Sequence, residues 1–168
     1  ITQPIGKSGG AARLLVPDGL LSLNKQFSRM RHNVKTPGDD GWLNVRIAHP
    51  GSSGYGTQVF RRFSNDGSGA AGVGLDLRDD RVGIVRRVGG TNTVVMPAIT
   101  GYGPGTRLWL DQTGDVHTLY RDGINVGSWN DATHTAAKGS GLRSAAMIMS
   151  GSKVLFGTRQ FSPSLDYF

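Results

Sequence analysis

The stretch RLWLDQTGDVHTLYRDGINVGSW, from Arg107 to Trp129, decides the fold class of this chain. It divides into three short runs joined by two turns. In the middle run, VHTLYR, the side chains alternate between two faces, which is the period of two that a strand with one buried face requires. Asp122-Gly123 separates the last two runs, and Asp-Gly favours a two-residue hairpin because both positions accept a positive φ. The stretch therefore predicts three consecutive antiparallel strands.

The same alternation recurs along most of the chain. In LNVRIAH, Leu43, Val45 and Ile47 share one face. Glycine interrupts nearly every window in which a helix would need apolar residues at i, i+3, i+4 and i+7. The predicted strands are residues 12–16, 20–24, 42–49, 57–63, 70–78, 82–88, 92–97, 106–111, 115–121, 124–129, 143–149 and 153–161. Because this is too many strands for one open sheet, we predict an all-β sandwich of two antiparallel sheets.

The domain organisation follows from length and local composition. A chain of 168 residues is long enough for one domain with its own core. The first residues, ITQPIGKSGG, are polar and glycine-rich, so we predict an arm over residues 1–11 and a single domain over residues 12–168. No apolar run reaches the ~20 residues that a membrane-spanning helix needs, and we expect no membrane insertion.

Composition excludes several kinds of chemistry. Cysteine is absent, so the chain has no disulfide framework and no thiolate for zinc binding or nucleophilic catalysis.

The net charge is +7, and 14 of the 19 basic residues are arginine, which favours contact with an anionic partner. The basic residues are scattered, mostly singly, at positions that strands would expose to water. We therefore expect no specific binding of nucleic acid.

Residues of the C-terminal half carry a resemblance to a known superfamily. They follow the pattern LY-x-DG-x-x-VGS, then a polar loop, then GLR, and they are Leu119, Tyr120, Asp122, Gly123, Val126, Gly127, Ser128, Gly141, Leu142 and Arg143. Together with the strands and turns of residues 42–161, this resembles the concanavalin A-like lectins and glucanases, which include laminin-G-like domains. The resemblance implies a jelly roll. The arginine-rich, glutamate-free composition and the glycine-rich arm also resemble modules of bacteriophage minor tail proteins.

The superfamily includes glycosidases, whose reaction normally needs two carboxylates. The retaining glucanases of this fold place two glutamates around an aspartate on one strand, and this chain contains no glutamate. In LDLRDDR, Asp76 is better explained as a surface residue and Asp79-Asp80 as a turn. There is no Gly-x-Ser-x-Gly nucleophile motif. The histidines are isolated and expected at the surface or at sheet edges: His32, His49, His117 and His134. We predict that the protein is not an enzyme.

Metal-ligand spacings such as His-x-x-x-His are missing from the sequence. Calcium is the metal that loop carboxylates and carbonyls would suit, and the candidate loops are residues 111–115 and 65–67. Both loops are also explained as hairpin turns without any ion. We predict no cofactor, and calcium stays open as the alternative.

Sugar binding needs an aromatic surface against the apolar face of a pyranose and planar polar groups for its hydroxyls. Tyr55 and Tyr102 stand between glycines in loops, and we expect both to be exposed contact residues. The tryptophans are candidates for the same role, but because they lie in or beside strands we expect them to pack in the core or at sheet edges: Trp42, Trp109 and Trp129. The solvated face of a sheet, next to a groove floored by Gly72 and Gly74, is expected to carry further contacts: Asn44, Arg46, Asp76 and Arg78. An ordinary solvated sheet face is the alternative.

Together with the resemblance, these observations predict a non-catalytic module of a virion surface or tail, located on the virion or outside the cell. It would attach to a host-surface glycan or pack within the assembly. The expected partners are other virion proteins and a host glycan, within a homo-oligomer for which a trimer is the candidate. Two alternatives stay open: a capsid or tail decoration protein without a ligand, and a secreted carbohydrate-active enzyme or its binding module.

Overall fold

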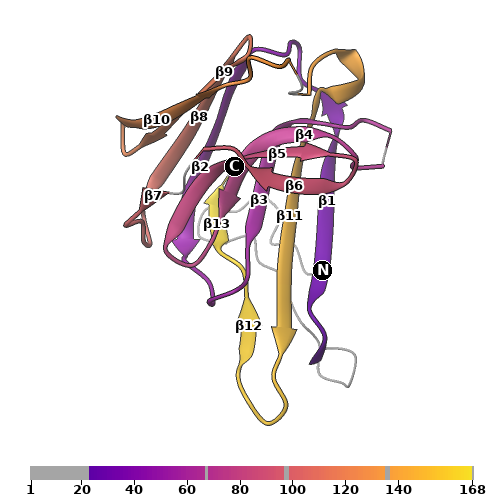
Figure 1. The fold of residues 1–168 in the computed structure, drawn as a ribbon. Coiled ribbons are helices and arrows are strands. Elements are labelled where there is room, and N and C mark those ends of the chain that lie inside the picture. Colours follow the sequence, from indigo (N-terminus) through magenta and orange to yellow (C-terminus); the bar gives the residue numbers. More distant parts are fainter. Residues whose placement is uncertain (1–22, 67, 97–98, 135–136, 168) are drawn as a thin grey trace.

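The computed structural model describes residues 23–66, 68–96, 99–134 and 137–167. The predicted arm, residues 1–11, and the predicted strand 12–16 lie outside these ranges, as does most of the predicted strand 20–24. The described chain is mainly β-structure, in two antiparallel sheets that pack face to face (Figure 1). This confirms the all-β sandwich predicted from the alternation of side chains.

The large sheet has the strand order β1-β11-β3-β4-β5-β6, with β12 beside β11 and β7 beside β5. Its strands are β1 (Gln26–Lys35), β3 (Thr57–Phe63), β4 (Gly72–Leu77), β5 (Arg81–Val88), β6 (Thr91–Val94), β7 (Ile99–Thr100), β11 (Ser144–Lys153) and β12 (Arg159–Phe161). The small sheet has the order β10-β9-β8-β2-β13. Its strands are β2 (Gly41–His49), β8 (Arg107–Thr113), β9 (Val116–Arg121), β10 (Ile124–Asn130) and β13 (Ser164–Tyr167).

Helical structure is sparse. A short 3-10 helix, η2 (Ser140–Leu142), leads into β11. Across the described ranges, no helix has the length and apolar character needed to cross a bilayer.

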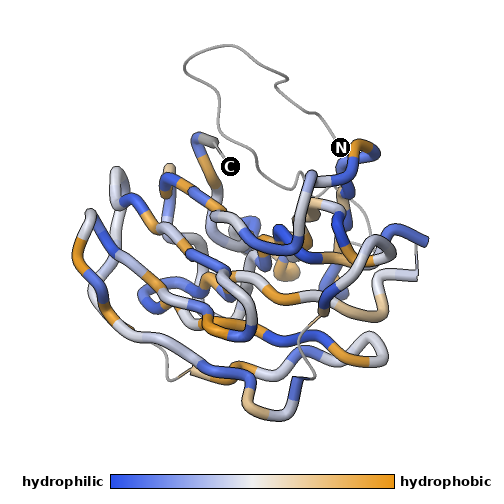
Figure 2. Tube along the Cα trace, turned by 90° about the horizontal axis from the view of Figure 1, so that it is seen from above, coloured by the Kyte–Doolittle hydropathy of each residue, from blue (hydrophilic) through white to orange (hydrophobic). Residues whose placement is uncertain are grey.

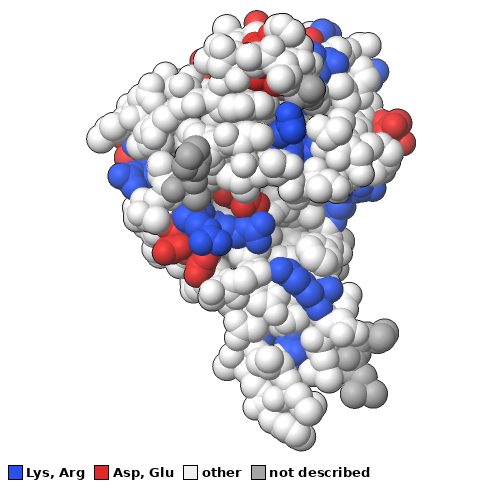
Figure 3. All heavy atoms as spheres, viewed as in Figure 1, with Lys and Arg blue, Asp and Glu red and all other residues white. Residues whose placement is uncertain are grey.

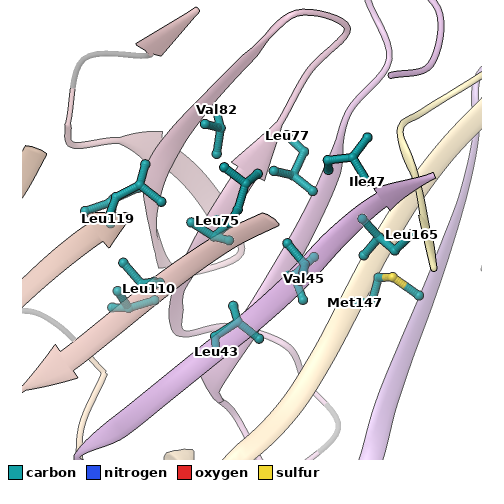
Figure 4. Packing of buried hydrophobic residues seen from close by; sticks show 14 of the residues in the cluster. Leu43, Val45, Ile47, Leu75, Leu77, Val82, Leu110, Leu119, Met147 and Leu165 are labelled. Atoms are coloured by element: carbon teal, nitrogen blue, oxygen red, sulfur yellow. The ribbon is translucent and has the colours of Figure 1, made fainter. Parts of the chain in front are cut away.

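The main core lies between the two sheets, where alternate residues of each strand point inward. Along the strands, hydrophobic positions alternate with hydrophilic ones (Figure 2). Each large apolar side chain buried in this way contributes about 1.5–3 kcal/mol to folding. Side chains from both sheets meet in this layer (Figure 4): Leu43, Val45, Ile47, Leu110, Leu119 and Leu165 from the small sheet, and Leu75, Leu77, Val82 and Met147 from the large sheet.

The large sheet is buried on both faces around β4, which contradicts the solvated face predicted there. A second apolar cluster lies on the face away from the main core and consists of Phe60, Phe63, Val85, Ala146 and Ile148. Phe60 pairs with Gly74, and Phe63 with Gly72. The two phenylalanine rings, with centroids 4.9 Å apart, lie against Gly72, whereas the backbone of β3 lies against Gly74. Gly72 and Gly74 therefore do not floor an open groove.

The sequence does not predict β1 or β13, and the predicted strand 153–161 is a hairpin in the structure. β11 ends at Lys153 and β12 begins at Arg159. β1 is hard to predict because it is an edge strand whose residues are mostly polar and exposed. Its backbone pairs with β11, and such pairing needs no apolar periodicity. Leu23 and Asn24, at the end of the predicted strand 20–24, are not in a strand.

Candidate functional site

Three aromatic side chains form a row on the outward face of the small sheet. They are Trp42 in β2, Trp109 in β8 and Tyr120 in β9, and we call them the aromatic row. The ring centroids of Trp42 and Trp109 lie 6.0 Å apart, and those of Trp109 and Tyr120 lie 5.9 Å apart. Trp42 is 61% exposed and Trp109 is 44% exposed. The row is thus a surface strip of large apolar rings that crosses three adjacent strands.

The alternation within each strand places these rings outward. The residues that flank the row in sequence point into the core: Leu43, Leu108, Leu110 and Leu119. Side chains next to an inward residue of a strand point to solvent. Trp109 pairs with Tyr120 on one side and with Asn44 on the other, so the register brings the rings together. The prediction that the tryptophans pack in the core or at sheet edges is therefore wrong for Trp42 and Trp109.

Polar side chains border the aromatic row on the same face. Asn44 lies opposite Trp109, and its Oδ1 atom is screened from solvent without a hydrogen-bond partner in the described structure. Arg46 and Arg107 lie opposite each other, two residues along the strands from Asn44 and Trp109, and both are exposed. Arg46 forms an exposed ion pair with Asp166, with Nε 3.6 Å from Oδ2. Amide and guanidinium groups are planar and can hydrogen-bond sugar hydroxyls.

The four polar residues predicted on one solvated face lie on different sheets. Asn44 and Arg46 are in β2 of the small sheet, whereas Asp76 is in β4 of the large sheet and Arg78 follows it. Asp76 is only 4% exposed. Its carboxylate accepts hydrogen bonds from Gln58 Nε2 at 2.6 Å and from Arg78 Nε at 2.8 Å. The structure brings Asp76 and Arg78 together as an ion pair and separates both from the aromatic row.

Tyr102 is buried, so the prediction that it is exposed is wrong. It is 8% exposed and belongs to the main core. Gly101 and Gly105 have φ angles of 82° and 87°, and this left-handed backbone lets the GYGPG loop turn the tyrosine inward. The Tyr102 hydroxyl has no hydrogen-bond partner within the described ranges. Burial, followed by the nearby carboxylates of Asp79 and Asp80, raises the pKa of this phenol above its usual value.

Tyr55 is half-buried and already engaged. Its hydroxyl hydrogen-bonds with the hydroxyl of Ser152 in β11. Lys25 Nζ lies 4.8 Å from the Tyr55 ring centroid, and this ammonium also donates to Gly54 O at 2.6 Å. Tyr55 therefore lies against the large sheet and is not part of the aromatic row.

A polar cluster lies inside the sandwich, next to the β8–β9 turn. Arg62 and His117 are fully buried. Arg62 donates to Asp39 O at 2.7 Å and to Gly114 O at 3.1 Å, and His117 Nδ1 lies 3.3 Å from Gln112 Nε2. Burial, followed by the charge of Arg62, lowers the pKa of His117 to about 4. The expectation of a surface or edge histidine is wrong for His117, which is a neutral structural group at pH 7.

The described part of the chain contains no group of three or more His, Cys, Asp or Glu that could hold a metal ion. In the candidate loop 111–115, Lys138 and His134 bind the Asp115 carboxylate, His134 Nδ1 at 2.6 Å, and these contacts lower the Asp115 pKa. In the other candidate loop, Asp66 Oδ1 accepts the Ser68 N–H at 2.9 Å, and residue 67 lies outside the described ranges. Both carboxylates are thus engaged by the protein itself.

Comparisons with known proteins bear on the fold. No protein-family model and no curated protein match the chain. The carbohydrate-binding module CBM66 from Bacillus subtilis is similar with a TM-score of 0.54 and 15% identity, over 92% of this chain and 90% of that one. The β-glucanase of Bacillus licheniformis is similar with a TM-score of 0.55 and 11% identity, over 96% of this chain and 97% of that one. At these identities the similarity shows the fold alone: the chain has the concanavalin A-like jelly-roll architecture.

Proposed function

We propose that this chain is a non-catalytic carbohydrate-binding domain whose ligand lies on the outward face of the small sheet. The observation that carries the proposal is the aromatic row, in which Trp42 and Trp109 keep 61% and 44% of their surface exposed. A contiguous exposed apolar strip rimmed by polar groups marks a binding surface. The rim here includes Asn44, Arg46 and Arg107, which are outward on the same face.

The geometry of the row favours an extended saccharide. A pyranose has an apolar face of C–H groups that packs on an aromatic ring, while its hydroxyls need hydrogen bonds at the side. Ring centroids 6.0 Å and 5.9 Å apart make a strip longer than one sugar ring would cover. The ring planes are tilted by 60° and 46° to each other. Such a surface suits one twisted polysaccharide chain and not the flat face of a crystalline polymer.

The proposed function is non-catalytic because the carboxylates of the chain do not suit glycoside cleavage. Acid–base cleavage of a glycoside needs two carboxyl groups on either side of the bond. The chain contains no glutamate. Asp76, which with Asp79 and Asp80 forms the carboxylate group of the stretch LDLRDDR, is buried, and its two oxygens accept hydrogen bonds from Gln58 and Arg78. The two similar folds named above, one a binding module and one a glucanase, are compatible with either function.

The proposal extends to the setting in which the domain works. Each aromatic contact contributes about 0.5–1.5 kcal/mol beyond its buried area, so a single copy binds weakly. Many copies on one particle would raise this affinity through a high effective concentration. Display on a virion, with other virion proteins and copies of itself as partners, would supply this high effective concentration. The virion setting is supported by the resemblance of the arginine-rich, glutamate-free sequence to phage tail modules.

A glycan array and affinity electrophoresis with soluble polysaccharides test the binding surface. The double variant Trp42→Ala/Trp109→Ala should lose at least about tenfold in affinity for the bound saccharide, because two stacking surfaces are removed. Val116→Ala is the matched control, since Val116 is 44% exposed on the same face of β9 but lies outside the row. It should bind as the wild type does.

Three results would overturn the proposal. The first is a wild-type protein that binds no saccharide. The second is a double variant that binds as well as the wild type while its circular-dichroism spectrum is unchanged. The third is the release of reducing ends from a bound polysaccharide, which would show an enzyme. Adsorption of the chain to bacterial cells, with loss in the double variant, tests the attachment role.

A further inference from the structure

Two arginines lie opposite each other on the outward face of the small sheet. Arg46 in β2 pairs with Arg107 in β8, both are exposed, and we call them the arginine pair. Directly opposed side chains of an antiparallel pair lie about 4.5–5.5 Å apart at their Cβ atoms, and like charges at that spacing repel each other. An anion bound between the two guanidinium groups would relieve the repulsion.

The chain itself neutralises the arginine pair only in part. Arg46 Nε lies 3.6 Å from Asp166 Oδ2, and the two side chains are 45% and 38% exposed, so this ion pair is weak. Asp122 Oδ1 accepts the backbone N–H of Arg107 at 2.9 Å. The Arg107 guanidinium itself has no ion pair or hydrogen bond with any residue in the described part of the chain. It is therefore available to a ligand.

The arginine pair lies next to the aromatic row. Arg107 and Trp109 are two residues apart in β8 and share its outward face, and two residues of strand rise about 7 Å. A charged group bonded directly to a sugar ring that stacks on Trp109 is then within reach of the Arg107 side chain. The carboxylate of a uronic acid is such a group, and a guanidinium holds a carboxylate through two parallel hydrogen bonds.

The opposite end of the aromatic row carries a negative charge. Asp111 lies opposite Trp42, two residues beyond Trp109 in β8, and its Oδ2 accepts a hydrogen bond from the Thr113 hydroxyl at 3.4 Å. Charge along this face thus changes from basic beside Trp109 to acidic beside Trp42. An acidic sugar is attracted at the first position and repelled at the second, and discrimination among ligands uses both effects.

The excess of positive charge is not gathered in one broad patch on the face that Figure 3 shows. The chain carries a net charge of +7, but the Lys and Arg side chains of this face lie in several separate groups, some of them beside acidic side chains. A broad basic surface attracts polyanions of every kind. Separate groups instead favour recognition of an anion by particular side chains.

We infer that the aromatic row binds an acidic polysaccharide whose sugar rings bear carboxylates. In this arrangement one uronic acid ring stacks on Trp109, its carboxylate binds the arginine pair, and a neutral sugar ring lies on Trp42 beside Asp111. The inference rests on the proposed function, because it needs a saccharide on the aromatic row. It adds the class of saccharide: stacking supplies affinity for sugar rings in general, and the arginine pair selects the charged one.

Calorimetric titration of the full chain with matched polymers tests the inference. The probes are polygalacturonate, alginate and hyaluronate, each beside its carboxyl-reduced form, in which the carboxylates are primary alcohols and the rings are kept. We expect at least one acidic polymer to bind about tenfold or more tightly than its reduced form, because charge-assisted hydrogen bonds are lost on reduction. The difference should shrink at high salt.

Three variants locate the charge recognition. Arg107→Gln should weaken binding of that acidic polymer about tenfold, because the available guanidinium is lost, and should leave binding of the reduced form and the urea midpoint unchanged. Asp111→Asn should strengthen binding of the acidic polymer about twofold to threefold, because a repelling charge is removed. Lys35→Gln is the matched control: it removes the same charge from an exposed position of β1, in the other sheet, and should change neither affinity.

The inference is overturned if each acidic polymer and its reduced form bind equally, or if Arg107→Gln binds the acidic polymer as the wild type does. It is also overturned if Arg107→Gln loses dextran sulfate to the same extent, which would make the arginine pair a general anion site. Trp42→Ala/Trp109→Ala should lose binding to both forms of the polymer. Absence of binding to every polymer overturns the proposed function as well, whereas equal binding of the two forms leaves it standing.

Discussion

His117 in β9 stacks on Trp129 in β10, with ring centroids 5.1 Å apart and ring planes 22° apart. The two residues are paired across the strands. The indole covers an imidazole that is fully buried. Burial and the positive charge of Arg62 both disfavour a second proton, which lowers the His117 pKa to about 4. In the small sheet, Trp129 therefore packs over the neutral His117, whereas Trp42 and Trp109 are exposed to solvent.

This arrangement predicts that stability falls as the pH drops below about 6.5. The unfolded histidine has its ordinary pKa of 6.5, whereas the folded one has a pKa of about 4, so the unfolded chain binds the proton more tightly. The contribution of His117 is fully present above pH ~6.5, declines as the pH falls, and is lost at about pH 4. A shift of this size corresponds to about 3 kcal/mol. Urea unfolding at several pH values measures it.

Two variants isolate this effect. His117→Gln should flatten the dependence of the unfolding free energy on pH between about 4 and 6.5. His32→Gln changes an exposed histidine whose ring contacts Val34 of its own strand and should leave that dependence in place. Asp39 and Asp115 have a lowered pKa in the folded protein. Their contribution to the unfolding free energy is lost only at pH values below the range in which His117 acts. An unchanged slope in His117→Gln would contradict the prediction.

Arg62 should be one of the most sensitive charged positions in the chain. It is fully buried and donates to Asp39 O and Gly114 O, and its Nη2 lies 3.3 Å from Asp40 Oδ1. Arg62→Met keeps much of the side-chain volume but leaves these acceptors without their donor. We expect a loss of about 2–4 kcal/mol in unfolding free energy.

Arg46→Met is the control for Arg62→Met. The Arg46–Asp166 pair is 3.6 Å long and exposed, and such pairs contribute about 0–1 kcal/mol. Urea titrations of both variants give the comparison. If Arg62→Met and Arg46→Met lose the same unfolding free energy, burial does not determine how much an arginine contributes to stability.

Gly74 is expected to tolerate no side chain. A Cβ at this position would lie 1.9 Å from Val59 O and 2.8 Å from Phe60 Cα. Because both atoms belong to the backbone of β3, Gly74→Ala would force the paired strands apart and should cost about 3 kcal/mol or more. At Gly103 a Cβ would meet nothing within 4 Å, so Gly103→Ala should leave the thermal midpoint nearly unchanged. A stable Gly74→Ala protein would disprove the close approach of β3 and β4.

Tyr102→Phe should raise stability slightly. The hydroxyl is buried without a hydrogen-bond partner in the described structure, and a buried unpaired hydroxyl costs about 1–3 kcal/mol. Removing it keeps the ring in the core, so we expect an increase of about 1 kcal/mol and no change in saccharide binding. A fall in stability would indicate a partner for the hydroxyl, and a fall in binding would restore Tyr102 as a contact residue.

The strands and the hairpin turns are largely predictable because they depend on local chemistry. The alternation in LNVRIAH predicts the buried face of β2, and Leu43, Val45 and Ile47 are indeed in the core. The Asp122-Gly123 signal is confirmed by φ angles of 50° and 86°. The outward position of Asn44 and Arg46 follows from the same alternation.

The candidate site could have been predicted from the phase of that alternation. Trp42 and Trp109 are out of phase with the core leucines beside them in sequence, which predicts an outward ring. The general tendency of tryptophan to be buried leads to the opposite expectation. The register that sets Trp109 beside Tyr120 in one direction and Asn44 in the other depends on how three strands align, and the sequence of a single strand does not contain it.

By itself, the sequence determined that this protein is built from strands with two distinct faces, since side-chain alternation is a property of each strand's own geometry. Only the tertiary structure decided which outward faces stay open. The Phe60 and Phe63 rings cover Gly72, and Tyr102 turns into the core, whereas Trp42 and Trp109 of the small sheet remain at the surface. The physical reason is that burial of a second face depends on groups that lie far away in the sequence and meet only when the sheets pack.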